Sequence, residues 1–122
     1  MQTQNSSGFK AFLTNATQIN EGMRVKIVSA GVVDVAGATD KAIGVACHTA
    51  AAGGAPISIK LFSASGTFMV VTSAAIAVGT QVYPTANGAI AGTGTTALPF
   101  ITFEAAAESG DIIEVGEVWI GA

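Results

Sequence analysis

The chain repeats one order of glycines and apolar residues in both of its halves. The first copy reads Ile19-x-x-Gly22-x-x-Val25, Gly31-x-Val33, Ala42-Ile43-x-Val45, Ala50-Ala51-Ala52-Gly53-Gly54 and Ile57-x-Ile59. The second copy reads Ile76-x-x-Gly79-x-x-Val82, Gly88-x-Ile90, Ala97-Leu98-x-Phe100, Ala105-Ala106-Ala107, Gly110 and Ile113-x-Val115. The copies lie 57 residues apart at first, 55 in the middle and 56 at the end, so a two-residue deletion and a single-residue insertion align them. Because the repeated pattern holds no reactive side chain, it predicts a duplicated structural unit rather than a catalytic site.

Chance is the other explanation of the repeat, because half of the 122 residues are apolar and 15 are glycine. The preserved order and spacing favour duplication. We therefore expect a single β domain over residues 15–122, with pseudo-repeats near residues 19–61 and 76–118. The polar residues that open the chain indicate an extended N-terminal arm over residues 1–14.

Short apolar or alternating segments separated by turn residues recur along the whole chain. We expect roughly nine to eleven strands with turns about every 8–12 residues, the pattern of an all-β sandwich or barrel. No segment shows a sustained helical period, and Glu104–Glu108 has room for one helical turn only. The predicted fold class is therefore all-β, a compact sandwich or barrel of short strands.

Two glycines mark positions of special backbone geometry. The pair Asn87-Gly88 favours a type I′ hairpin turn, because both residue types tolerate a positive φ. Gly116 interrupts the closing strand, and a bulge there would place Ile113, Val115 and Trp119 on one side.

Charged side chains are scarce in this chain. They make up 11% of the residues, against about 25% in a typical globular protein. Interface cores are depleted in charge, so the composition predicts large areas covered by partner subunits. The alternative is a monomer with a surface of Thr, Ser and Ala.

Few basic residues are available for nucleic-acid binding, and the net charge is −3. Residues 23–29 alternate as a half-buried strand, with Arg24 and Lys26 on one face and Met23, Val25 and Ile27 on the other. Two cations do not make the extended phosphate contact that nucleic acids require. Neither a run of eighteen apolar residues nor a signal-peptide pattern is visible, so we expect no membrane span and synthesis in a cytosol.

Catalytic chemistry is not indicated. Cys47 and His48 are neighbours on a predicted strand, so their side chains point to opposite faces. Each is the only residue of its type, which excludes a zinc site or a Cys–His nucleophile within one chain. We expect a buried thiol beside a surface imidazole, no cofactor, no metal and no enzymatic activity.

Acidic residues gather toward the C-terminus: Glu104, Glu108, Asp111, Glu114 and Glu117. A calcium loop would place acidic residues at alternate positions, and that spacing is absent. A solvated acidic rim is the favoured interpretation, and a bound ion stays open.

The aromatic residues are spread along the chain, which is typical of a core role. Within the expected arm, Phe9, Phe12 and Leu13 are candidates for docking on a partner. Trp119 is a candidate subunit contact, because Trp is enriched at interface hot spots.

One ordered set of motifs resembles a known family. The set comprises Ile43-Gly44-Val45-Ala46, Ala50-Ala51-Ala52-Gly53-Gly54, Ile57-Ser58-Ile59-Lys60-Leu61, Gly66-Thr67-Phe68 and Gly79-Thr80-Gln81-Val82-Tyr83. In these motifs the chain is similar to the capsid decoration, or cement, proteins of tailed bacteriophages, over about residues 19–120. The resemblance implies a structural virion protein on the outer capsid surface. It would form a homotrimer and bridge neighbouring major capsid protein subunits.

Two other classes of function remain to be separated from this one. A small β-sandwich binding module, for example for glycans on a virion or cell surface, would be a monomer whose melting temperature depends on carbohydrate. An enzyme would show turnover that is lost on mutation of His48 or of a C-terminal carboxylate.

Overall fold

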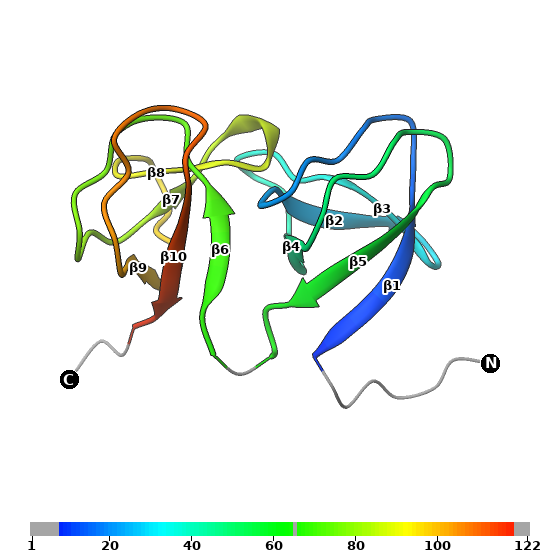
Figure 1. Cartoon of the computed structure of the whole chain (residues 1–122), viewed down its shortest axis with the longest axis horizontal. Coiled ribbons are helices and arrows are strands. Elements are labelled where there is room, and N and C mark those ends of the chain that lie inside the picture. Colours follow the sequence, from blue (N-terminus) through cyan, green and yellow to red (C-terminus); the bar gives the residue numbers. More distant parts are fainter. Residues whose placement is uncertain (1–7, 65, 119–122) are drawn as a thin grey trace.

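The computed structural model describes residues 8–64 and 66–118, which form two lobes lying side by side (Figure 1). The first lobe contains β1 (Phe9–Thr14), β2 (Arg24–Ser29), β3 (Val32–Val35), β4 (Gly44–Ala46) and β5 (Pro56–Leu61). The second lobe contains β6 (Phe68–Val71), β7 (Tyr83–Pro84), the 3-10 turn η1 (Ala86–Gly88), β8 (Ile90–Ala91), β9 (Phe100–Thr102) and β10 (Ile112–Glu117). No α-helix occurs among the described residues, and the predicted all-β class is confirmed.

The first lobe is a closed five-stranded barrel in the order β1-β3-β2-β4-β5. Only β1 and β3 run parallel; the other neighbours are antiparallel. Closure leaves no open sheet edge in this lobe. Alternate side chains point inward and form the barrel core: Phe12, Ile19, Val25, Val33, Ala46, Ala50, Ile57 and Ile59.

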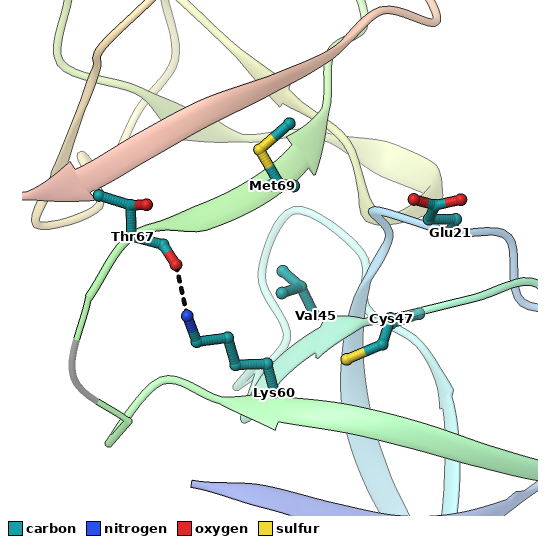
Figure 2. Close-up of a pocket in the computed structure, with 7 residues that line it drawn as sticks. Glu21, Val45, Cys47, Lys60, Thr67 and Met69 are labelled. Atoms are coloured by element: carbon teal, nitrogen blue, oxygen red, sulfur yellow. Dashed lines mark hydrogen bonds between the residues drawn. The ribbon is translucent and has the colours of Figure 1, made fainter.

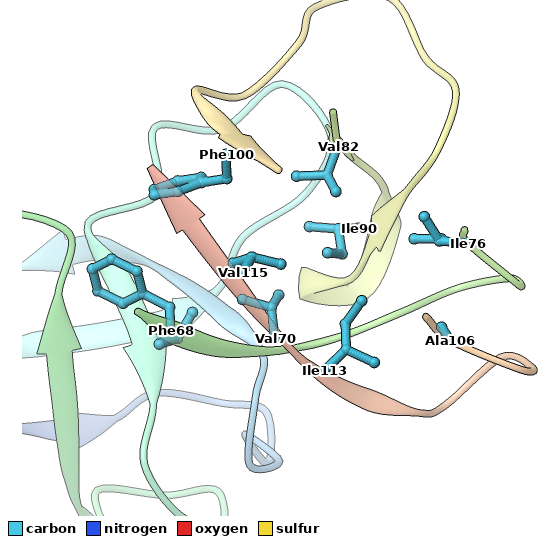
Figure 3. Close-up of a cluster of buried hydrophobic side chains, with 10 residues drawn as sticks. Phe68, Val70, Ile76, Val82, Ile90, Phe100, Ala106, Ile113 and Val115 are labelled. Carbon is cyan, nitrogen blue, oxygen red and sulfur yellow. The ribbon is translucent and has the colours of Figure 1, made fainter. Parts of the chain in front are cut away.

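The second lobe contains a three-stranded sheet, β6-β10-β9, and the pair β7-β8. Single bridges between Thr72 and Ile90 and between Gln81 and Ile101 connect the two parts. The circular order is therefore β6-β8-β7-β9-β10, the same as in the first lobe. Figure 3 shows its core, which consists of Val45, Phe68, Val70, Ile76, Val82, Ile90, Phe100, Ala106, Ile113 and Val115.

The repeat predicted from the sequence is present as the same strand pairing in both lobes. Ile19 bridges to Ala50 in the first lobe, and Ile76 bridges to Ala106 in the second. Three further first-lobe pairs have an equivalent in the second lobe: Arg24–Val45 corresponds to Gln81–Ile101, Thr14–Val33 to Thr72–Ile90, and Phe12–Ile57 to Val70–Ile113. Equal registers require equal spacing of inward-facing residues, which is why the glycine and apolar pattern recurs.

One detail of the sequence alignment needs correction. In the second lobe, the N–H of Leu98 makes the hydrogen bond that is equivalent to the one made by the N–H of Ile43. The hydrogen bond that the carbonyl of Ile43 accepts, however, is accepted there by the carbonyl of Pro99. The Leu98-Pro99 pair thus takes the place of Ile43, and the later strand positions lie 56 residues apart. Ala50 therefore corresponds to Ala106, one position later than the sequence pattern suggested.

The expected N-terminal arm is wrong for residues 9–14, because these residues form β1. Residues 9–13 pair one by one with residues 56–60 of β5, and Phe12 is only 6% exposed in the barrel core. The alternation of this segment gives it one inward and one outward face, so it closes the barrel. Residues 1–7 lie outside the described part of the chain.

Burial along β2 also differs from the expected alternation. Val25 is buried as predicted, but Arg24 is buried too, and Ile27 is 54% exposed. The start of β2 lies between the barrel core and the second lobe, so both of its faces are covered there. Its far end has no second layer, and its side chains are exposed from Ile27 onward.

Three local predictions have different outcomes. Asn87 (φ 60°) and Gly88 (φ 71°) both take positive φ between β7 and β8, as a type I′ turn requires. The helical turn expected at Glu104–Glu108 is absent, because Ala106 there bridges to Ile76. Gly116 keeps a regular register and forms no bulge.

Candidate interaction surfaces

Arg24 is a buried charged residue at the contact between the lobes. Its side chain is 1% exposed, and Nη2 donates to the carbonyl oxygens of Thr85 at 2.8 Å and Ala89 at 3.1 Å, while Nε donates to Ala89 at 3.3 Å. Burial lowers the pKa of Arg24, and the negative charge of Asp40 partly opposes this. An arginine keeps its charge near neutral pH, so these bonds join the barrel to the β7–β8 hairpin through a charged donor.

Asp40 is an acidic group whose negative charge acts on Arg24. Its Oδ2 accepts from the N–H of Gly37 at 2.7 Å and from Nζ of Lys26 at 3.1 Å. The Gly37 bond first, and then Lys26, hold the pKa of Asp40 below its usual value. The two bonds fix the loop between β3 and β4 beside Arg24.

Aromatic contacts complete the junction between the lobes. Phe62, which follows β5, packs edge-on against Phe68 at 5.3 Å between ring centroids and lies equally close to Phe100. Val45 of the barrel belongs to the core cluster of the second lobe. The lobes therefore share one apolar contact and are not independent domains.

A pocket of about 230 Å³ opens between the lobes (Figure 2). We call it the interlobe pocket; it is lined by Glu21, Val45, Ala46, Cys47, Lys60, Thr67 and Met69. Lys60 crosses it, with Nζ donating to the Thr67 carbonyl at 2.6 Å and lying 4.9 Å from the Phe68 ring centre. Besides Lys60, which is held by these contacts, Glu21 is the charged residue of the lining, and the others are small or apolar.

The thiol of Cys47 is exposed, so the prediction of a buried cysteine is wrong. His48 is also exposed, and its ring is held by the backbone: Ser58 N–H donates to Nε2 at 3.1 Å, and Nδ1 lies 3.2 Å from the Thr49 carbonyl. With Nε2 as acceptor, Nδ1 carries the proton. Both ring nitrogens of His48 thus interact with backbone groups and not with Cys47.

The acidic residues near the C-terminus accept hydrogen bonds from nearby N–H and hydroxyl groups. Asp111 accepts from the N–H groups of Ala107 and Glu108, Glu104 accepts from the Glu114 N–H, and Glu114 accepts from the Thr67 hydroxyl. Across residues 8–64 and 66–118, no three His, Cys, Asp or Glu side chains group to hold a metal ion. In the described structure, these carboxylates stabilise turns and strands by accepting hydrogen bonds.

Large apolar side chains are exposed on both lobes. The first lobe exposes Phe9, Leu13, Ile27 and Val28, and the second exposes Met69, Val78, Phe103 and Ile112. Phe103 is 49% exposed, and its ring covers Gly116, where a Cβ atom would clash with it. Exposed apolar groups on a rigid sheet are typical of protein–protein contact surfaces.

The four predicted contact residues fall in different places. Phe9 and Leu13 lie on the outer face of β1 and are exposed, whereas Phe12 points into the barrel core and is not offered to a partner. Trp119 lies outside the described residues. The structure adds Val28, Val78 and Phe103, which the sequence pattern did not separate from core residues.

Comparison with known proteins finds no family model and no curated protein that matches this chain. Among the described residues there is also no helix long and apolar enough to cross a membrane.

Proposed function

We propose that this chain is a structural virion protein that binds the outer surface of a bacteriophage capsid, bridges major capsid protein subunits and has no enzymatic activity. One observation supports this most: large apolar side chains are exposed on both lobes of a rigid β scaffold that carries few charges. Such a surface gains free energy when a partner covers it. The resemblance of its motifs to those of capsid decoration proteins supports a capsid as the partner.

Self-association is part of the proposal, with a homotrimer as the expected state. Each chain has a mass of 12.1 kDa, so native mass spectrometry would report a species of three times that mass. Trimers multiply weak contacts with the shell, because one bound subunit raises the effective concentration of the other two.

Capsid attachment can be measured by co-sedimentation with expanded, empty phage heads that lack their own decoration protein. We expect saturable binding to expanded heads and a higher temperature of head disruption. Unexpanded heads serve as the control, since their subunit spacing differs. A chain that stays in the supernatant with expanded heads at micromolar concentration would contradict the proposal.

A further inference from the structure

We propose that copies of this chain associate head to tail, so that the second lobe of one copy contacts the first lobe of the next through surfaces equivalent to those that face each other between the two lobes of one chain. The inference rests on the proposed function, because it assumes the self-association stated there. It adds which two surfaces of the copies meet. The second copy is the only partner that it requires.

The contact inside one chain provides the template. On the barrel side, Glu21, Val45, Cys47 and Lys60 line the interlobe pocket, and Lys60 reaches across it to the Thr67 carbonyl. On the side of the second lobe, Thr67 and Met69 line the same pocket, and the Val71 N–H donates to the Gly22 carbonyl of the barrel at 3.0 Å. The hairpin residue Thr85 is bound there by Arg24.

The internal repeat places an equivalent of the barrel side on the second lobe. By the strand registers, Glu21, Val45, Cys47 and Lys60 correspond to Val78, Ile101, Phe103 and Gly116. We call these four residues the rear face. Val78 is 63% exposed, and Phe103 is 49% exposed although one side of its ring packs on Gly116.

The repeat likewise places on the first lobe an equivalent of the second-lobe side of the interlobe contact. Thr67, Met69, Val71 and Thr85 correspond to Phe9, Ala11, Leu13 and Val28. We call this set the front face. Its three large members are all exposed.

The substitutions between the equivalent surfaces favour an intermolecular contact. The barrel side of the interlobe pocket carries the charges of Glu21 and Lys60, whereas the rear face has Val78 and Gly116 at those positions. On the front face, Phe9 and Val28 replace two threonines, Thr67 and Thr85. Both exposed faces are thus more apolar than the surfaces to which they correspond, as expected where a partner covers them.

A contact between two different faces is heterologous, so it generates a ring where the rotation closes and a filament where it does not. In a closed ring of three copies, first and second lobes would alternate around the circle, six lobes in all. The capsid-facing surface would then lie outside the front and rear faces.

The test uses two variants that each block one face. Leu13→Glu introduces a carboxylate into the front face, and Val78→Glu introduces one into the rear face; both native side chains are exposed, so the fold tolerates the change. Burying an unpaired carboxylate should weaken association about a hundredfold or more. Ala52→Glu is the matched control, because the equivalent position of the second lobe already holds Glu108.

Native mass spectrometry of each variant and of their mixture decides the matter. Each single variant should be monomeric, the control should assemble like the wild type, and mixing the two variants should give only a one-to-one dimer. That dimer forms through the intact front face of one variant and the intact rear face of the other, and it shows that both are folded.

A single variant that still assembles, or a mixture that stays monomeric, would overturn the head-to-tail arrangement. A monomeric wild type would overturn self-association itself. Binding to expanded heads is a separate readout, so failure of capsid attachment with intact complementation would reject only the proposed function.

Discussion

The guanidinium of Arg24 donates two hydrogen bonds to the carbonyl oxygen of Ala89, from Nε at 3.3 Å and from Nη2 at 3.1 Å. Arg24 lies at the start of β2 in the barrel, and Ala89 follows the turn of the β7–β8 hairpin. The described hydrogen bonds of this buried charge go to carbonyl groups of the other lobe, so the position of one lobe depends on the other.

Replacing Arg24 with Met should lower the free energy of unfolding by about 1.5–3 kcal/mol. The change removes the donor of the Thr85 carbonyl, whereas the Ala89 carbonyl still accepts from the Thr85 N–H at 3.0 Å, and a lost hydrogen bond to a charged group costs about 1.5–3 kcal/mol. Urea unfolding followed by circular dichroism measures the loss. Lys26→Met, which removes an exposed ion pair with Asp40, is the control and should cost less than about 1 kcal/mol. Equal losses in the two variants would contradict this role of Arg24.

Gly31 and Gly88 occupy equivalent turns, with φ of 75° and 71°, but differ in their surroundings. A Cβ at Gly31 meets nothing within 4 Å, whereas one at Gly88 would lie 3.0 Å from the backbone N and O of Arg24. Gly31→Ala should therefore cost about 1–2 kcal/mol for the left-handed backbone alone. Gly88→Ala should cost about 1–3 kcal/mol more, because the lobes must separate slightly. Thermal unfolding of both variants compares them, and similar losses would reject the close approach.

The two lobes should unfold in one transition. Val25 and Val82 are equivalent core residues of the two lobes, and both are fully buried. Truncating either to Ala removes buried methyl groups and leaves a cavity, which should cost about 2–3 kcal/mol. Because the lobes share Val45, Phe62 and Arg24, each variant should shift the same single calorimetric transition. Two separate transitions, each moved by one variant, would show that the lobes are independent.

Asp40 should make stability depend on pH in the acid range. Its pKa in the folded chain is lowered, so its contribution is complete above the unfolded-state pKa and is lost as the pH falls through the folded-state pKa. Asp40→Asn should therefore be less stable than the wild type near neutral pH, and the two should converge in acid. Urea midpoints across the acid range measure this. A difference that does not change with pH would show that the Gly37 N–H and Lys26 do not stabilise the ionised carboxylate.

Much of the local structure could be predicted from the sequence. The spacing of glycines and apolar residues indicated two copies of one β unit, and the Asn87-Gly88 pair indicated the hairpin turn. These signals are local, because a positive φ favours glycine or asparagine and an inward face needs every second residue apolar. The same signals failed for Phe12, which alternates between exposed neighbours in the same way that a docking arm would.

The sequence by itself thus determined the fold class, the strand pattern and the duplication. Only the tertiary structure decided which apolar residues stay exposed and where the charge of Arg24 is placed. Burial of Phe12 depends on closure of the barrel, and Val78 and Phe103 stay exposed because no second layer of the described chain packs over that face of the second lobe. Strand alternation assigns a side chain to a face, but the layer that covers that face comes from residues far away in the chain.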